Sequence, residues 1–301
     1  GSGNYSVNNV GSYGYYWTSS KGDYANTAQQ LSFQAYAGRN IVSTLIYTGS
    51  AVRLVHDYEK DYSEIFDFST DGTTATITQY KGSEEDVTIP ETVKIDGTVY
   101  TVTAVGEEAF MSKGYIQSVT IPATIVSFGG KAFYNCSNLK TVHYQGTLSQ
   151  WCGITFGNEY ASPCSNKGVF IVGGEEVTEL VIPDGVTSIP AYAFSYCQNL
   201  KSVSFPSTLT TIGSKAFYMC ETISAVFIPN TVTNIGTYIF YGCHTNIFCE
   251  VTSALEGWAS DWKYFLNNAY WGKNGIMEYN YSITDATNHT AEYGPYFGTA
   301  E

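Results

Sequence analysis

The residue types that most often carry enzyme chemistry are sparse in this 301-residue chain, and their spacing does not suit catalysis. The four histidines are His56, His143, His244 and His289, and no two of them have the close spacing of a metal-binding pair. The chain also lacks a nucleophile elbow, a phosphate-binding loop and a dinucleotide fingerprint. We therefore predict that the protein is not an enzyme and uses no metal and no cofactor.

Carboxylates gather in two short runs, Glu84 to Asp86 and Glu175 to Glu179. Neither run has the alternating oxygen ligands of a calcium-binding loop, so solvated charge on turns is the favoured interpretation. The net charge of −13, with only 14 Lys and Arg, argues against nucleic acid as a partner. A hydrophobic content of 44% argues against a disordered chain. No apolar run approaches the roughly 18 residues that a membrane span needs.

Seven cysteines are the remaining reactive side chains, and Cys197, Cys220 and Cys243 are spaced evenly along the chain. Cys136 occupies the same position of the pattern described below. Two interpretations stay open, disulfides between neighbouring cysteines or a column of buried free thiols, and the inward-facing position favours the thiols. A bridge between Cys152 and Cys164 is a further alternative.

The elements that position these residues are internal repeats, with a period of about 23 residues. The segment Leu200 to Cys220 recurs as Ile223 to Cys243, and three earlier copies bring the number to five. The shared unit reads L-x-x-V-x-I-P-x-x-V-T-x-I-G-x-x-A-F-x-x-C. Its first apolar positions alternate as on a short strand, and the proline that follows ends the strand. One unit cannot bury its own apolar side chains, so stacked units must share one core.

The unit resembles the BspA-type leucine-rich repeat of bacterial surface proteins, typical of Bacteroidetes, over about residues 57–290. The resemblance implies a right-handed, β-rich horseshoe solenoid with short helical or 3-10 turns, over residues 57–301. It also implies an irregular long repeat at about 140–180 and a C-terminal cap at about 250–301, closed by Trp258, Trp262 and Trp271. Within the repeats, register predicts one core phenylalanine per unit: Phe110, Phe133, Phe194, Phe217 and Phe240.

Residues 1–56 lie outside the repeats. The segments Gly14 to Ser20, Leu31 to Phe33 and Ala51 to Val55 resemble the last third of a C-type-lectin-like module of the Fibrobacter major paralogous type. We expect a small truncated β module here, or a remnant that packs as an N-terminal cap. No sugar-binding carboxylate and amide pair accompanies the resemblance.

Two sets of side chains are candidate binding surfaces. The first is the outward side of the repeat strands, expected to form the concave face, with Ser118, Thr120, Thr141, His143, Glu179, Ser202, Ser204 and Phe227. The second candidate surface consists of tyrosines, of which the chain has an unusually large number, 26. Three tyrosines follow directly after a core phenylalanine and are expected to form an outer column: Tyr134, Tyr218 and Tyr241.

Together these features suggest a non-enzymatic cell-surface or secreted protein that adheres to host matrix proteins or to other bacterial surfaces through its repeats. The chain begins Gly1-Ser2-Gly3 without an apolar signal segment, so export follows from the resemblance alone. A glycan-binding accessory module is one alternative, in which the partner is a polysaccharide. A rigid spacer that displays another domain is the other.

The register predicts that Phe217→Ala lowers the free energy of unfolding by about 3–5 kcal/mol, because it opens a cavity in the shared core. Ser204→Ala, on the outward side of a strand, should be nearly neutral. Urea melts of both variants check this prediction, and equal effects would refute the repeat alignment.

Overall fold

A computed structural model describes residues 62–263 and 267–272 in full, together with the backbone of four strands closer to the N-terminus. The chain divides into two compact units, Gly1–Asp61 and Tyr62–Glu301. The strands of the first unit pair as antiparallel hairpins: β1 (Tyr13–Ser19) with β2 (Ala28–Gln34), and β3 (Ser43–Thr48) with β4 (Ala51–His56). The side chains of residues 1–56, where a lectin-like module was expected, lie outside the described part of the chain.

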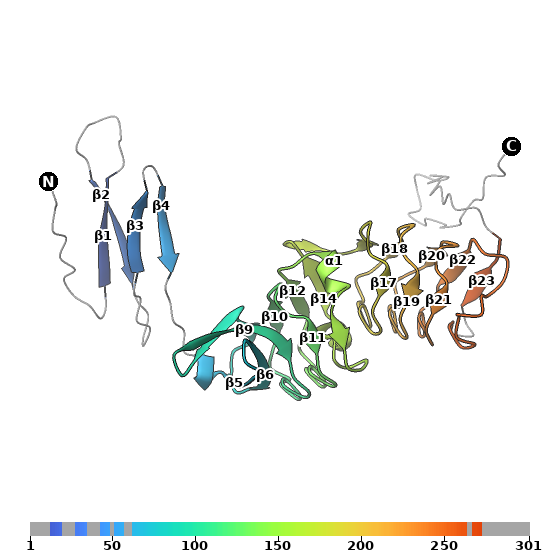
Figure 1. Ribbon diagram of the computed structural model, residues 1–301, viewed down its shortest axis with the longest axis horizontal. Helices are drawn as coiled ribbons and strands as arrows, with labels where there is room; N and C mark the ends of the chain where they lie inside the picture. Colours follow the sequence, from blue (N-terminus) through green and yellow to red (C-terminus); the bar gives the residue numbers. More distant parts are fainter. Residues whose placement is uncertain are drawn as a thin grey trace, which may run out of the picture. The chain divides into compact units, whose positions relative to one another are not determined.

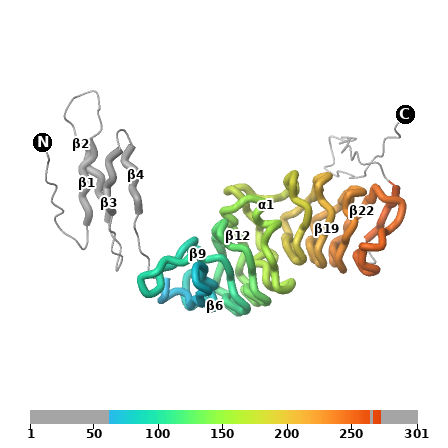
Figure 2. The backbone as a smooth tube through the Cα atoms, in the orientation of Figure 1, coloured from blue at the N-terminus to red at the C-terminus, as the bar shows by residue number. Residues whose placement is uncertain are grey.

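The second unit is a stack of coils whose strands form two rows, and most coils contribute one strand to each row (Figures 1 and 2). The first row contains β7 (Asp86–Thr88), β10 (Ser118–Ile121), β12 (Thr141–Tyr144), β14 (Val169–Val172), β16 (Glu179–Val181), β18 (Ser202–Ser204), β20 (Ala225–Ile228), β22 (Asn246–Cys249) and β23 (Asn268–Tyr270). The second row contains β6 (Thr74–Tyr80), β9 (Thr98–Val105), β11 (Ser127–Phe128), β13 (Thr155–Phe156), β17 (Ser188–Ile189), β19 (Thr211–Ile212) and β21 (Asn234–Ile235). Strands of neighbouring coils that pair within a row are parallel.

Other elements interrupt the regular coils. Near the start of the unit lie η1 (Tyr62–Glu64), β5 (Phe66–Thr70), which pairs antiparallel with β6, and β8 (Thr92–Ile95), which forms a hairpin with β9. The region predicted as an irregular long repeat contains α1 (Leu148–Trp151), η2 (Pro163–Asn166) and β15 (Glu175–Glu176). Thr147 caps α1 through a reciprocal capping box with Gln150.

The strand register follows the spacing of the sequence pattern. Ser188 pairs with Thr211, and Thr211 pairs with Asn234, so each partner lies one repeat unit further along the chain. A third run of backbone hydrogen bonds joins the corners of the coils, for example from Phe217 N to Ile239 O at 3.0 Å. Regular coils such as these are therefore held to one another on three sides.

The glycine of the repeat is required where neighbouring coils approach most closely. A Cβ atom at Gly213 would collide with the backbone of Ala191 in the preceding coil, and one at Gly236 would collide with the backbone of Ser214. The regular spacing between coils thus depends on the missing side chain rather than on an unusual backbone dihedral.

The core is one continuous apolar column, and the five predicted core phenylalanines all lie in it. The rings of Phe194 and Phe217 stack with centroids 5.5 Å apart, and Phe240 continues the stack at 5.3 Å. Phe110 and Phe133 form an equivalent stack at 4.8 Å nearer the start of the unit. Trp151 and Phe170 fill the irregular region between the two stacks, with centroids 4.6 Å apart.

The cysteines of the repeat are buried free thiols, and three of them bond to the preceding coil. Cys243 Sγ donates to Phe217 O of the preceding coil at 3.1 Å, and Cys136 and Cys220 form the same contact with Phe110 and Phe194. Cys152 and Cys164 are separate free thiols, so the bridge that the sequence left open does not form.

The stack has a junction after β14. Thr141 pairs with Val169 and Ser127 with Thr155, so the coil before the junction is longer than the coils that follow it. The chain then turns back through the β14–β15 hairpin, and β14 does not pair with β16. Among the described residues, the strands on either side of the junction therefore belong to separate sheets.

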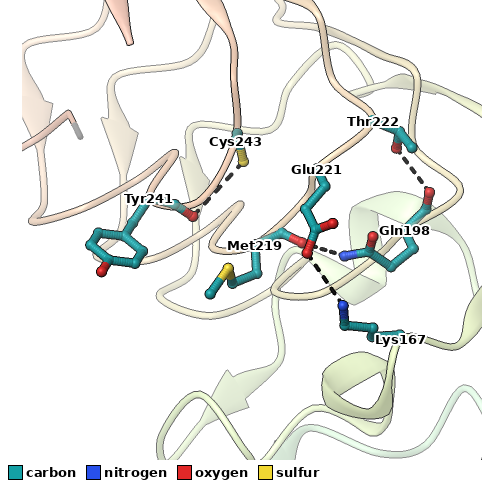
Figure 3. A network of polar contacts seen from close by, with 7 residues as sticks. All are labelled: Lys167, Gln198, Met219, Glu221, Thr222, Tyr241 and Cys243. Atoms are coloured by element: carbon teal, nitrogen blue, oxygen red, sulfur yellow. Dashed lines mark hydrogen bonds and ion pairs between the residues drawn. The ribbon is translucent and has the colours of Figure 1, made fainter. Parts of the chain in front are cut away.

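Side chains connect the two sides of the junction in place of strand pairing. Asn199 Nδ2 donates to Val177 O at 2.8 Å, and Asn199 Oδ1 accepts from Phe170 N at 3.3 Å. Trp151 Nε1 donates to Ala193 O at 2.9 Å. Figure 3 shows a further contact, the ion pair of Lys167 with Glu221 at 3.3 Å, beside Gln198, which donates to the carbonyl oxygen of Met219.

The junction predicts different roles for two asparagines at the same repeat position. Asn199→Leu should lower the free energy of unfolding by about 1–3 kcal/mol, because it leaves Phe170 N and Val177 O without these partners. Asn138 is exposed and has no side-chain hydrogen bond among the described residues, so Asn138→Leu is the matched control. Urea denaturation compares the two variants, and an equal loss would contradict the assigned role of Asn199.

Thiol burial predicts that the protein loses stability in alkali. Burial raises the pKa of Cys152, Cys243 and Cys249 to about 12 and that of Cys136 to about 11, from an ordinary value near 9. The folded chain therefore keeps protons that the unfolded chain releases above about pH 9, so each such thiol favours unfolding by up to about 1.4 kcal/mol per pH unit there.

Urea melts between pH 7 and pH 10.5 measure this effect. The free energy of unfolding should hold up to about pH 8 and then fall, and the fall should be shallower in Cys243→Ala, which has one fewer thiol to ionise. A stability that does not change up to pH 10.5 would show that the thiols are not held in their neutral form.

Candidate interaction surfaces

The outward side chains of the first strand row form a surface that we call the strand face. In the first half of the stack, Ser118 pairs with Thr141 and Thr120 pairs with His143 in neighbouring coils. All four side chains are half-buried, because each strand lies between two others. These four predicted residues therefore lie together, in two short rows of adjacent coils.

The strand face continues beyond the junction with a different composition. Glu179 pairs with Ser202, and Val181, which is 60% exposed, pairs with Ser204. Further along, Phe227 pairs with Phe248, whose ring stacks on Tyr270 with centroids 4.9 Å apart. The predicted residues Glu179, Ser202, Ser204 and Phe227 thus lie on the second sheet of the face, apart from the first four.

The chemistry of the strand face is that of a broad contact surface. Five of the eight predicted residues of the face carry hydroxyl groups, and the only ionisable ones are His143 and Glu179, which belong to different sheets. Among residues 62–263 and 267–272 there is no group of three or more His, Cys, Asp or Glu side chains able to hold a metal ion. Small neutral side chains suit a shallow contact better than a pocket with convergent charges.

The second candidate surface is a set of tyrosines at the corners of the coils, which we call the tyrosine ridge: Tyr134, Tyr160, Tyr196, Tyr218, Tyr238 and Tyr241. The rings of Tyr218 and Tyr241 stack with centroids 5.1 Å apart, and Tyr196 contacts Tyr218 at 5.5 Å. Tyr238 meets Tyr241 edge-on at 5.7 Å. Four tyrosines from three consecutive coils therefore form one aromatic group.

The predicted outer column is thus only part of a larger group. Tyr218 and Tyr241 lie side by side, whereas Tyr134 lies before the junction and contacts Tyr160 at 4.9 Å. The prediction omitted Tyr196 because it lies two residues after its core phenylalanine instead of one. No signal in the local sequence identifies it, because its contact with Tyr218 arises from the stacking of two coils.

An ion pair lies within the ridge. Lys215 Nζ is 3.0 Å from Glu159 Oε1 across the junction, and it also lies 5.1 Å from the ring centroid of Tyr218. Burial opposes ionisation of both groups. The hydrogen bond with Glu159 nevertheless raises the pKa of Lys215, and hydrogen bonds from its own backbone and then from Lys215 lower the pKa of Glu159. The ridge therefore holds this pair in its charged form near neutral pH.

Three phenols of the ridge, those of Tyr196, Tyr218 and Tyr238, have a raised pKa. Burial, followed by the proximity of Tyr218, raises the pKa of Tyr196 to about 12. The pKa of Tyr218 is also raised, mainly by burial, and that of Tyr238 is raised by its hydrogen bond with Asp261. These side chains are consequently hydrogen-bond donors over the whole physiological pH range.

The tryptophans expected in the cap lie against the last regular coil. Trp258 and Trp262 are buried with ring centroids 5.0 Å apart, and Trp271 packs on both. Trp258 Nε1 donates to Val232 O at 3.0 Å.

In the described part of the chain, no helix has both the length and the apolar character that crossing a membrane requires.

Comparison with solved structures finds bacterial leucine-rich repeat proteins. A leucine-rich cell surface protein of Faecalibacterium prausnitzii is 34% identical, with 64% of this chain and 54% of that chain covered and a TM-score of 0.47. The chain thus spans about half of that protein. A leucine-rich repeat protein of T. pallidum is 21% identical (66% and 91% covered, TM-score 0.44), and one of Bacteroides ovatus is 17% identical (69% and 66% covered, TM-score 0.36).

No curated protein matches the chain. The family model of the BspA-type leucine-rich repeat region matches in six copies, over residues 84–162 and 169–260. The two ranges are separated by residues 163–168, which precede β14, and together they cover more than half of the chain. The resemblance of the repeat unit is therefore confirmed: this chain belongs to the BspA-type leucine-rich repeat family.

Proposed function

We propose that this protein is a non-enzymatic, exported surface protein that binds other proteins through the strand face. The observation that carries the proposal is the composition of that face, in which small neutral side chains such as Ser118, Thr141, Ser202 and Ser204 extend across successive coils. The partners we propose are host matrix proteins or the surfaces of other bacteria.

The geometry supports a protein partner more than a small molecule. Parallel strands of neighbouring coils hold their outward side chains at a fixed spacing, so the face is rigid before it binds and loses little entropy on binding. Proteins of the BspA-type family are generally surface proteins that act in protein interactions, which favours the same conclusion.

A glycan-binding role is a second candidate, and one feature of the strand face favours it. Near its end, Tyr270 is 40% exposed and stacks on Phe248, and the side chains of Asn246 and Asn268 bond to each other beside them. An aromatic ring next to amide groups offers a sugar both a flat apolar contact and hydrogen bonds.

The proposal is tested by measuring binding of the chain to immobilised fibronectin and to whole bacterial cells. Ser204→Arg places a long charged side chain at the centre of the strand face and should weaken binding at least tenfold. Ser188→Arg is the matched control, because Ser188 is an equally exposed strand serine in the second row. It should bind like the unaltered protein.

Two results would contradict the proposal. The first is no saturable binding to either target, and the second is equal weakening by the two arginine variants. Saturable binding to a glycan array that is lost in Tyr270→Ser, without binding to fibronectin or to cells, would favour the second candidate instead.

A further inference from the structure

The tyrosine ridge presents hydrogen-bond donors that the protein itself does not use. Within the described residues, the phenol oxygens of Tyr134, Tyr160, Tyr196 and Tyr218 form no hydrogen bond. Tyr134 is 42% exposed, and the other three are half-buried with their rings in contact with a neighbour. A partner that lies along the ridge therefore meets ring surfaces and free O–H groups together.

The corners of the coils that carry Tyr196 and Tyr238 have a left-handed backbone. Tyr196 and Tyr238 have φ angles of 63° and 55°, in the left-handed region that bulky residues rarely adopt. In another coil the position of Tyr196, directly before the repeat cysteine, is Gly242 with a φ of 77°. Ser112, Asn135 and Met219 occupy the same position with φ angles of 59–61°, so the left-handed backbone is a feature of every regular coil and does not by itself call for tyrosine.

The charges along the ridge restrict the partner. The ridge brings one cation, Lys215, against two carboxylates, Glu159 and Asp261, and the whole chain carries a net charge of −13. An anionic partner such as a sulfated glycan, a nucleic acid or an acidic membrane would be repelled. A neutral or basic polypeptide would not.

The spacing of the rings fits an extended proline-rich helix. In adjacent coils, the ring centroids of Tyr196 and Tyr218 are 5.5 Å apart, and those of Tyr218 and Tyr241 are 5.1 Å apart. A polyproline II helix has three residues per turn and repeats about every 9 Å, so one of its turns spans about two coils. Its carbonyl groups have no internal hydrogen bonds and can accept from the free phenols, while its prolines pack on the rings.

We propose that the tyrosine ridge is a docking site for proline-rich polypeptide segments in the polyproline II conformation, with basic residues beside the prolines. The inference rests on the proposed role in protein binding and names a class of partner for it. It assigns this partner to the corners of the coils, a surface separate from the strand face.

Fluorescence anisotropy with a defined peptide tests the inference. The probe is a labelled peptide of four Pro-Pro-Leu triplets with an Arg at each end, and the control peptide has Ala in place of every Pro. The first should bind saturably and the second should not. A double variant, Tyr196→Ser with Tyr218→Ser, should bind the first peptide at least tenfold more weakly, and the corresponding Tyr→Phe pair should lose a smaller part by lacking only the hydroxyl groups.

Tyr270→Ser is the control, because Tyr270 lies on the strand face and is 40% exposed, close to the 42% of Tyr134 in the ridge. It should leave peptide binding unchanged. Thermal melts establish that each variant is folded. Tyr134→Ser, on a largely exposed side chain outside the main ring group, provides a second test with little risk to the fold, and it should weaken binding several-fold.

Three outcomes would overturn the inference: no saturable binding of the proline-rich peptide, equal binding of the alanine peptide, or unchanged binding by the ridge variants. Binding of a neutral polysaccharide such as hydroxyethylcellulose through the same tyrosines, without peptide binding, would also overturn it. The strand-face proposal is judged separately, because Ser204→Arg affects fibronectin binding in that test and leaves the ridge intact.

Discussion

The structure depends on one constraint, that no coil can bury its own apolar side chains and each must be covered by its neighbour. Phe217 is fully buried because Phe194 lies on one side of its ring and Phe240 on the other. The other regularities follow from this stacking. Glycine allows the backbones to approach, and the cysteine thiol donates to the coil before it. Stability is therefore shared between neighbours, as expected for a solenoid.

Features that repeat were predictable from the sequence, because each copy supports the alignment of the others. The core phenylalanines, the inward cysteines and the outward positions of the strands all follow from one short pattern of apolar and small residues. The structure places Phe110, Phe217 and Phe240 in the core as this pattern predicts.

Features that occur once were not predictable. Asn138 and Asn199 occupy the same repeat position, but only Asn199 faces a broken sheet and bonds to the backbone across it. The family resemblance indicated an irregular long repeat, but not its division into a lengthened coil and a hairpin. Tyr196 was missed because its neighbours in the ridge come from other coils, and their proximity depends on stacking rather than on the local sequence.

The junction has a consequence for how such an array can change its length. In the described residues, backbone pairing between strands stops after β14 and resumes at β16, and side chains such as Trp151 and Asn199 connect the two blocks. A coil gained or lost by duplication or deletion within one block leaves the register of the other undisturbed. The joint thus divides this chain into two blocks with independent strand registers that still share one continuous core.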